Sequence, residues 1–195
     1  MNIRTDRRGQ SMQVGAMLIF AMVVVAMASY QVTVVPSQNA GVEFNHNQQV
    51  QNQLVEGREA ILRTATVGSS QPITVDLGTE FPSRTVFINP PAPAGTLKTV
   101  ELGNVVISGA AGVDEADEAT DYWNGDDRTF VTSGLSYTPG YSEYQQPPTT
   151  IYEHSVLYDR LGDGTVIAKT GQDLVDGRRL NLVLLEGELS TTQSG

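Results

Sequence analysis

The chain has 195 residues, of which 22 are acidic and 12 basic, so its formal net charge is −10 at pH 7. This acidity argues against nucleic-acid binding, because contact with phosphates needs a basic patch. The sequence contains no cysteine, which excludes disulfides, thiolate metal sites and cysteine nucleophiles. The length suits one domain of common size with an additional segment.

The basic residues are ten arginines and only two lysines, Lys98 and Lys169. An acidic surface poor in lysine is typical of proteins from salt-loving archaea, because carboxylates hold water and hydrated cations whereas the long lysine stem adds apolar surface. We interpret the composition as halophilic. An ordinary acidic secreted domain of high-GC origin is the alternative.

The first long segment is apolar. Residues 9–42 carry no charge, and residues 14–35 are almost entirely hydrophobic. As a helix these residues measure about 33 Å, which matches a hydrocarbon core of about 30 Å, and a helix satisfies its own backbone hydrogen bonds in lipid. Arg4, Arg7 and Arg8 precede the segment, and acidic residues dominate the chain after it. The positive-inside rule therefore predicts a single-pass protein in the cell membrane, with a cytoplasmic N-terminus and an extracellular C-terminal domain.

The sequence leaves the fate of this segment open. A secretory signal would be cut at the A-x-A site Ala26-Met27-Ala28 and would release the protein. A twin-arginine signal would use Arg7 and Arg8. An uncleaved segment would remain as a signal anchor.

A fourth fate follows from a family resemblance. Arg7-Arg8-Gly9-Gln10, followed by SMQVGAMLIFAMVVVAMASYQ, resembles the class III signal peptide of archaeal type IV pilins and archaellins, and similar starts occur in haloarchaeal surface proteins of unassigned role. The resemblance covers residues 1–65. It implies that a prepilin peptidase cuts between Gly9 and Gln10, so that residues 1–9 are a leader. The acid that bacterial-type pilins carry early in the mature helix is here Val14.

The same resemblance implies partners. In that family the apolar helix stays on the mature subunit, anchors it in the membrane, and later packs with copies of itself or other pilin-like subunits in surface filaments. The amphipathic half of a pilin helix packs on a β-domain.

Pro36 is predicted to end or kink the apolar helix, because proline lacks an amide hydrogen. We therefore assign residues 10–36 to the transmembrane helix and residues 37–66 to a polar hinge (37–41) and an amphipathic helix (45–66). Its apolar positions form one stripe: Val50, Leu54, Ile61 and Ala65. Gly57 lies within the stripe as a soft or closely packed point. The opposite face is expected to be polar: Gln48, Gln51, Asn52, Glu56 and Arg63.

Residues 67–189 are predicted to form an extracytoplasmic β-rich domain, because short runs of branched residues alternate with Gly, Pro, Asn and Asp. The expected strands are residues 73–77, 84–88, 96–107, 129–132, 151–158, 165–169 and 179–188. Turns are expected at residues 161–164 and 176–177, and a stiff proline-rich loop at 89–95. The fold class is therefore α+β, with an N-terminal transmembrane helix, a second amphipathic helix and an antiparallel sheet or sandwich. Residues 190–195 read as a polar, structureless tail.

One acidic cluster is a weak candidate for a Ca²⁺ site, because clustered carboxylates are ligands that calcium prefers. It spans residues 114–127, and its candidate ligands are Asp114, Asp117, Asp121 and Asp126. The spacing fails the EF-hand pattern, so a solvated acidic loop is the preferred interpretation. We predict no metal and no cofactor.

Catalysis finds little support in the sequence, and we predict that the protein is not an enzyme. His46 and His154 lie in different contexts, and no HExxH, GxSxG or P-loop motif occurs. Ser155 follows His154 on an expected strand, which would point the two side chains to opposite faces. A tyrosine-rich stretch is either a contact surface or an irregular loop with partly buried rings; its tyrosines are Tyr137, Tyr141, Tyr144 and Tyr152.

The sequence thus predicts a membrane-anchored, pilin-like structural protein of the cell surface, acting as a filament subunit or an adhesin. The alternative is a secreted or anchored ligand- or ion-binding β-domain of unassigned role.

Overall fold

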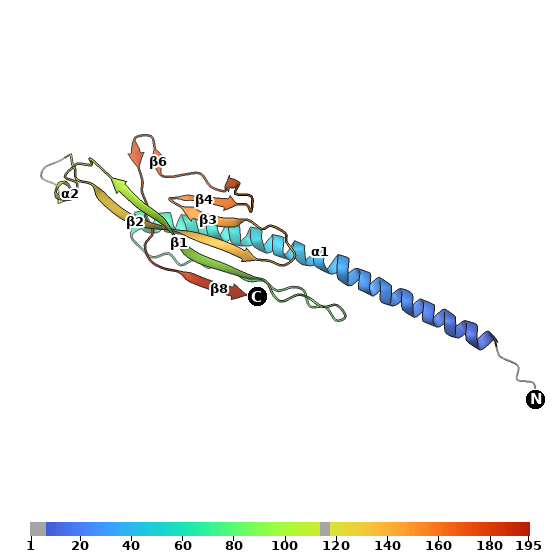
Figure 1. Cartoon of the computed structure of the whole chain (residues 1–195). Coiled ribbons are helices and arrows are strands. Elements are labelled where there is room, and N and C mark those ends of the chain that lie inside the picture. The colour runs from blue at the N-terminus through green and yellow to red at the C-terminus, as the bar shows by residue number, and fades with distance from the viewer. Residues whose placement is uncertain (1–6, 114–117) are drawn as a thin grey trace, which may run out of the picture.

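A computed structural model describes residues 7–113 and 118–195, with side chains from residue 11 onward. The fold consists of one long helix, α1 (Arg7–Val67), and a β-rich domain. The N-terminal half of α1 projects from the domain and is free of it (Figure 1). Its C-terminal half lies along the antiparallel sheet. The α+β class with an apolar N-terminal helix is confirmed, and the β-domain is a sheet rather than a sandwich.

The predicted break at Pro36 is wrong, because α1 continues through Pro36 and through the expected hinge at residues 37–41. A proline inside a helix removes one backbone hydrogen bond and costs about 3 kcal/mol. The helix is buried against the domain on both sides of this proline, since Val35 is 1% exposed and Asn39 is fully buried. These tertiary contacts hold the turn helical, so the two expected helices are halves of one 61-residue helix.

Six strands form the main sheet, in the order β5-β4-β3-β2-β1-β8, and every pair is antiparallel. Their bounds are β1 (Ala94–Ile107), β2 (Arg128–Gly140), β3 (Thr149–Glu153), β4 (Val156–Arg160), β5 (Val166–Ala168) and β8 (Ser190–Ser194). A separate hairpin pairs β6 (Val175–Asp176) with β7 (Arg179–Leu180). The short helix α2 (Glu118–Tyr122) lies between β1 and β2, at the end of the molecule away from the free half of α1 (Figure 1).

Several expected strands differ from the structure. Residues 151–158 form the β3–β4 hairpin instead of one strand, because His154 and Ser155 adopt positive φ angles of 43° and 77° and reverse the chain. Residues 73–77 and 84–88 pair with no strand and belong to the irregular connection from α1 to β1. Of residues 179–188, only Arg179–Leu180 is a strand. The turns at residues 161–164 and 176–177 are confirmed.

The C-terminal tail was expected to be structureless, and this expectation is wrong. It forms β8, which pairs with residues 94–98 of β1. The Thr96 and Thr192 hydroxyls add a side-chain hydrogen bond of 2.9 Å. Pairing at a sheet edge uses backbone groups, which a polar sequence supplies as well as an apolar one.

The hydrophobic core lies between α1 and the sheet. Its buried members are Val50, Leu54, Leu77, Leu97, Tyr137, Tyr152 and Leu157. The predicted stripe is confirmed at Val50 and Leu54, but Ala65 is exposed. Gly57 is a closely packed point, because a Cβ there would lie 3.3 Å from Ile73 Cδ1. Gln51, expected on the polar face, is buried in this interface.

Candidate functional site

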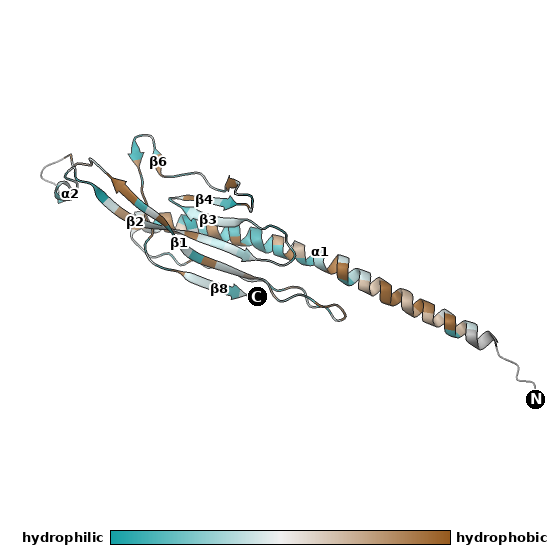
Figure 2. Ribbon diagram, in the orientation of Figure 1, coloured by the Kyte–Doolittle hydropathy of each residue, from teal (hydrophilic) through white to brown (hydrophobic). Residues whose placement is uncertain are grey.

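The free half of α1 is the longest exposed apolar feature among the described residues, and Figure 2 shows that most of it is coloured as hydrophobic. Leu18 is 58% exposed and Phe20 is 70% exposed. The helix contains an 18-residue window with a mean hydropathy of 2.2, of which only 6% is buried in the domain. The core helix of a soluble protein would be mostly buried. By length and composition, this segment can therefore cross a membrane.

The packed half of α1 is held by polar side chains, beginning with Glu43. This carboxylate is fully buried and accepts four hydrogen bonds from the loop after β2. The Ser142 backbone N–H and hydroxyl donate to Oε1 at 2.9 and 3.1 Å, and the Glu143 and Tyr144 N–H groups donate to Oε2 at 2.8 and 2.5 Å. One side chain thus fixes the path of residues 142–144 against the helix.

One turn further along, His46 joins the helix to two other segments. Its Nε2 lies 3.0 Å from the Asp76 carbonyl oxygen, which only accepts, so Nε2 carries the proton. Its Nδ1 then accepts from the Tyr141 hydroxyl at 2.7 Å. Tyr137 Oη lies 3.3 Å from Tyr141 Oη and extends this part-buried chain into the core. Burial raises the pKa of both tyrosines.

The buried position of His46 makes folding sensitive to pH. Desolvation lowers its pKa below the ordinary value of 6.5, although the carbonyl and carboxylate of Asp76 partly oppose the shift. Below about pH 6.5 the unfolded chain therefore binds a proton that the folded chain resists, and the free energy of unfolding falls by up to about 1.4 kcal/mol per pH unit. Above that pH both states are neutral at this residue, and its contribution is constant.

We expect the unfolding midpoint of the full chain in detergent to fall as the pH is lowered from about 7 to about 5. A His46→Gln variant, which keeps one donor and one acceptor, should lose much of this fall in circular dichroism melts. His154→Gln is the matched control, since His154 is only partly buried. An unchanged pH dependence in His46→Gln would contradict the assignment.

A third polar contact involves Gln51 and Asp159 of β4. The Gln51 side-chain amide donates to Asp159 Oδ2 at 3.1 Å and accepts from Lys169 Nζ at 2.9 Å. Thr150 Oγ1 donates to Asp159 Oδ1 at 2.7 Å, and Lys169 Nζ lies 3.4 Å from Asp159 Oδ2. The buried carboxylate is therefore both hydrogen-bonded and charge-paired, as burial of a charge requires.

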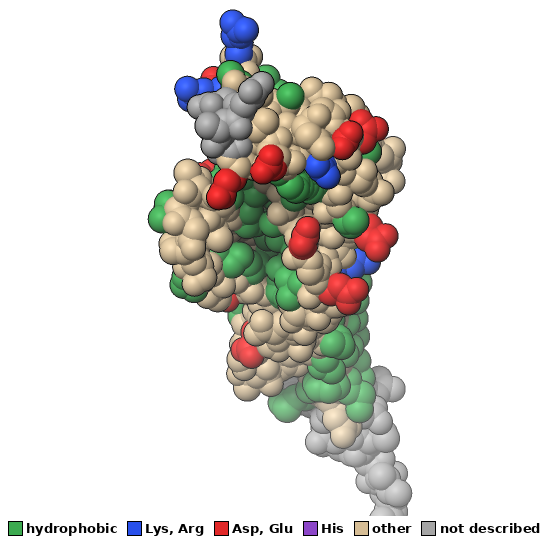
Figure 3. Space-filling model, turned by 90° about the vertical axis from the view of Figure 1, so that its left-hand side faces the viewer, with side chains coloured by type: hydrophobic (Ala, Val, Ile, Leu, Met, Phe, Trp, Pro, Cys, Tyr) green, Lys and Arg blue, Asp and Glu red, His purple; other side chains and the backbone are tan. Residues whose placement is uncertain are grey.

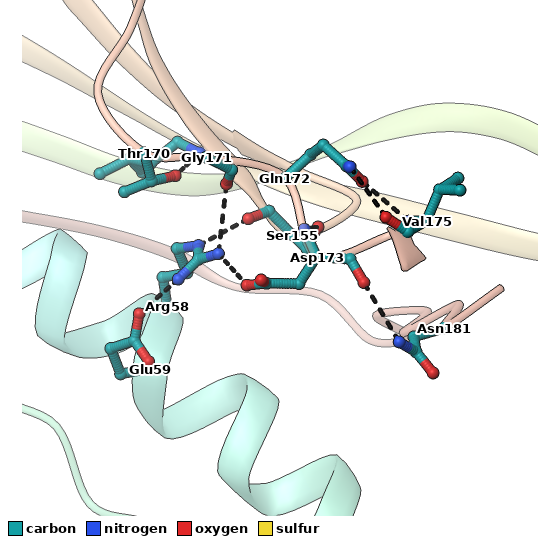
Figure 4. Close-up of polar contacts among 10 residues, drawn as sticks. Arg58, Glu59, Ser155, Thr170, Gly171, Gln172, Asp173, Val175 and Asn181 are labelled. Carbon is teal, nitrogen blue, oxygen red and sulfur yellow. Dashed lines mark hydrogen bonds and ion pairs between the residues drawn. The ribbon is translucent and has the colours of Figure 1, made fainter. Parts of the chain in front are cut away.

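Arg58 ties the packed half of α1 to the β3–β4 turn and to the segment before β6 (Figure 4). Its Nε donates to the Ser155 carbonyl at 2.6 Å, and its Nη2 donates to the Gly171 carbonyl at 3.2 Å. The guanidinium also pairs with the carboxylates of Glu59 and Asp173. The planar fork of arginine suits this fan of acceptors, because its N–H groups point in fixed directions.

These contacts form a polar ladder, which we define as Glu43, His46, Gln51 and Arg58 with their partners. The four side chains follow one face of α1, interleaved with Val50 and Leu54. Hydrogen bonds are directional, so the ladder fixes the register and rotation of the helix on the sheet more tightly than apolar packing alone. The free half of α1 is the continuation of this fixed helix.

The acidic candidates do not gather into a site in the described part of the chain. Asp114 and Asp117 lie outside the described residues. Asp121 belongs to α2, and the Asp126 N–H and Oδ2 bond to the Asn124 side chain at 3.1 and 2.8 Å. No group of three metal-ligating side chains forms among the described residues. On the face near α2, acidic side chains are spread across the surface (Figure 3).

The remaining sequence candidates have structural surroundings. Ser155 Oγ accepts the Asp173 N–H at 3.0 Å, and the two residues His154 and Ser155 form a turn rather than part of a strand. Tyr137 and Tyr152 belong to the core, whereas Tyr141 and Tyr144 are partly exposed around the Glu43 loop. Gly9 and Gln10 lie in the first turn of α1, where only the backbone is described.

Sequence reasoning missed Glu43 and Arg58. One signal was present for each: Glu43 is the first charge after the uncharged run, seven residues before Val50, and Arg58 lies four residues after Leu54. Both spacings place the charge on the buried face of a helix.

No protein-family model matches the chain, and no solved structure gives a significant match. The chain is 27% identical over 165 residues to a protein of Archaeoglobus fulgidus described as uncharacterized. The match covers 83% of this chain but 26% of that protein, so the chain spans about a quarter of the relative's length.

Proposed function

We propose that the protein is a membrane-anchored, pilin-like structural subunit of the cell surface. The observation that carries the proposal is the continuity of α1, in which an exposed apolar half joins a half fixed to the sheet by the polar ladder. A subunit that must hold a domain at a defined distance and orientation from a membrane or filament core needs this rigid connection.

The charges support an outward-facing domain. Arg4, Arg7 and Arg8 precede the apolar segment, and the chain after it is strongly acidic, which favours a cytoplasmic start and an extracellular sheet. In this proposal the first partner is a prepilin peptidase, which cuts between Gly9 and Gln10. Later partners are the membrane and other copies of the chain.

Assembly into a filament is the second part of the proposal. Removing the apolar half of α1 from lipid requires another apolar environment, and the same segment of neighbouring subunits supplies one. The side chains that would meet there are large and exposed in the single chain: Met17, Leu18, Ile19, Phe20 and Met22.

We expect the mature protein from an archaeal host with a prepilin peptidase to begin at Gln10 in mass spectrometry of the intact chain. A Gly9→Leu variant should keep its leader, because the peptidase of the resembled family cuts after glycine. Gly15→Ala is the matched control, since the space around Gly15 is open. A mature start at Ser29 would point to a released secreted protein, and an uncut start to a plain signal anchor; either contradicts pilin-type processing.

A further inference from the structure

The connection between α1 and β1 returns along the helix toward its free half (Figure 1). We call residues 84–89 the tip loop. The ring of Phe87 stacks on Tyr30 of α1 with a centroid distance of 4.6 Å. The Gln31 side chain donates to the Ile88 carbonyl at 2.8 Å and accepts the Ile88 N–H at 3.0 Å. The tip loop is therefore held at the level of Tyr30 and Gln31.

The tip loop presents apolar side chains that nothing in the described chain covers. Val86 is 63% exposed and Ile88 is 78% exposed. Acids are absent between Glu80 and Glu101, although the chain as a whole is strongly acidic. The charge within the loop is Arg84, whose guanidinium bonds to the side chains of Asn39, Gln38 and Asn89.

The position of the tip loop along α1 decides whether the loop can reach the membrane. Tyr30 precedes Val35, the end of the apolar segment, by five residues. At 1.5 Å per residue, the loop reaches roughly 7.5 Å past that end toward the membrane. Apolar side chains of interfacial segments lie about 5–10 Å deep at the boundary between headgroups and acyl chains.

We propose that the tip loop inserts Val86 and Ile88 into the outer-leaflet interface beside α1, as a second membrane contact. This inference rests on the proposed function, because the level of the loop is set by an anchored α1. Continuity with the apolar helix and the lack of acids favour lipid as the occupant. Gln31 and Tyr30 act as positioning residues. Two contacts fix the tilt of the sheet domain relative to the membrane plane, whereas a single helix leaves the domain free to tilt.

The test uses single cysteines, since the chain has none. Full-length Val86→Cys, Val131→Cys and Phe20→Cys proteins carry a fluorophore in vesicles of phosphatidylcholine and phosphatidylglycerol with brominated acyl chains. Val131 is the matched control, because this β2 valine is 60% exposed in the domain. We expect quenching of the Val86 label to exceed that of the Val131 label several-fold. Equal quenching at the two sites, with the Phe20 label strongly quenched, would overturn the tip-loop proposal alone.

Two further results separate the remaining explanations. An unquenched Phe20 label would show that the apolar half of α1 does not insert into the bilayer, and it would overturn both proposals. If the Val86 label is protected from water only while the protein is concentrated in the lipid, and this protection is lost on dilution, a second copy of the chain covers the loop. That result would overturn the lipid assignment. In the Val86→Cys protein, Gln31→Ala should lower quenching toward the Val131 level, whereas Gln48→Ala, at an exposed glutamine of the same helix, should not. Unchanged quenching in Gln31→Ala would contradict the positioning role.

Discussion

Replacing Glu43 by alanine should lower the free energy of unfolding by about 1.5–3 kcal/mol, the range for losing hydrogen bonds to a charged group and a large part of the 5–15 kcal/mol that holds a typical domain. The change leaves the N–H groups of Ser142, Glu143 and Tyr144 without their acceptor. Ser142 is exposed and Glu143 and Tyr144 are partly buried, so water recovers part of the loss, but it cannot replace the acceptor that ties these N–H groups to the helix. The loop after β2 should therefore detach from α1.

Chemical denaturation of the full chain in detergent, followed by near-ultraviolet circular dichroism, measures this effect, because Tyr141 and Tyr144 lie at the loop. Glu43→Gln should also destabilise the fold, since its amide places a donor against N–H donors. The control is Glu56→Ala, at an exposed glutamate of the same helix. Equal stability of Glu43→Ala and Glu56→Ala would show that the carboxylate does not hold the loop.

Replacing Arg58 by alanine should have an effect of similar size, again about 1.5–3 kcal/mol. The guanidinium is buried. Its removal deprives the carbonyls of Ser155 and Gly171 of a hydrogen-bond donor and leaves the Asp173 carboxylate without its cation. Asp173 is largely exposed, so water recovers part of that loss. The buried Ser155 carbonyl is the main uncompensated group.

Hydrogen exchange locates this effect as well as measuring it. In Arg58→Ala, backbone amides of residues 170–181 should exchange faster than those of β1 and β2, because Arg58 anchors that segment. Arg58→Lys should restore only part of the protection, since one ammonium cannot serve acceptors fanned in several directions. Arg63→Ala is the exposed control. Uniform or absent loss of protection would refute the anchoring role.

The apolar half of α1 and the class of the fold follow from the sequence because they depend on patterns that short windows contain. An uncharged run of this length has few alternatives to a spanning helix, and Val50 and Leu54 mark the buried face by spacing alone. The hairpin turns at residues 161–164 and 176–177 are equally local, because glycine and aspartate favour them within four residues.

The continuity of α1 through Pro36, the turn at residues 154–155 and the pairing of β8 depend on distant partners. The cost of Pro36 is known from local chemistry, but the packing of Val35 and Asn39 that offsets it comes from residues far along the chain. His154 and Ser155 lack the glycine that marks a two-residue hairpin turn in a sequence, yet β3 and β4 pair around them. The polar ladder has the same origin: Glu43 meets a loop about a hundred residues away, and no local pattern distinguishes a buried glutamate from a solvated one.

The spacing of the ladder has a mechanical consequence. From Glu43 to Arg58 the contacts extend along roughly 22 Å of helix, and α1 enters the domain as the continuation of its free half. A force that pulls the sheet domain along the helix axis therefore shears these contacts side by side, so that they share the load and fail together. The same bonds arranged end to end would open one after another under a much smaller pull.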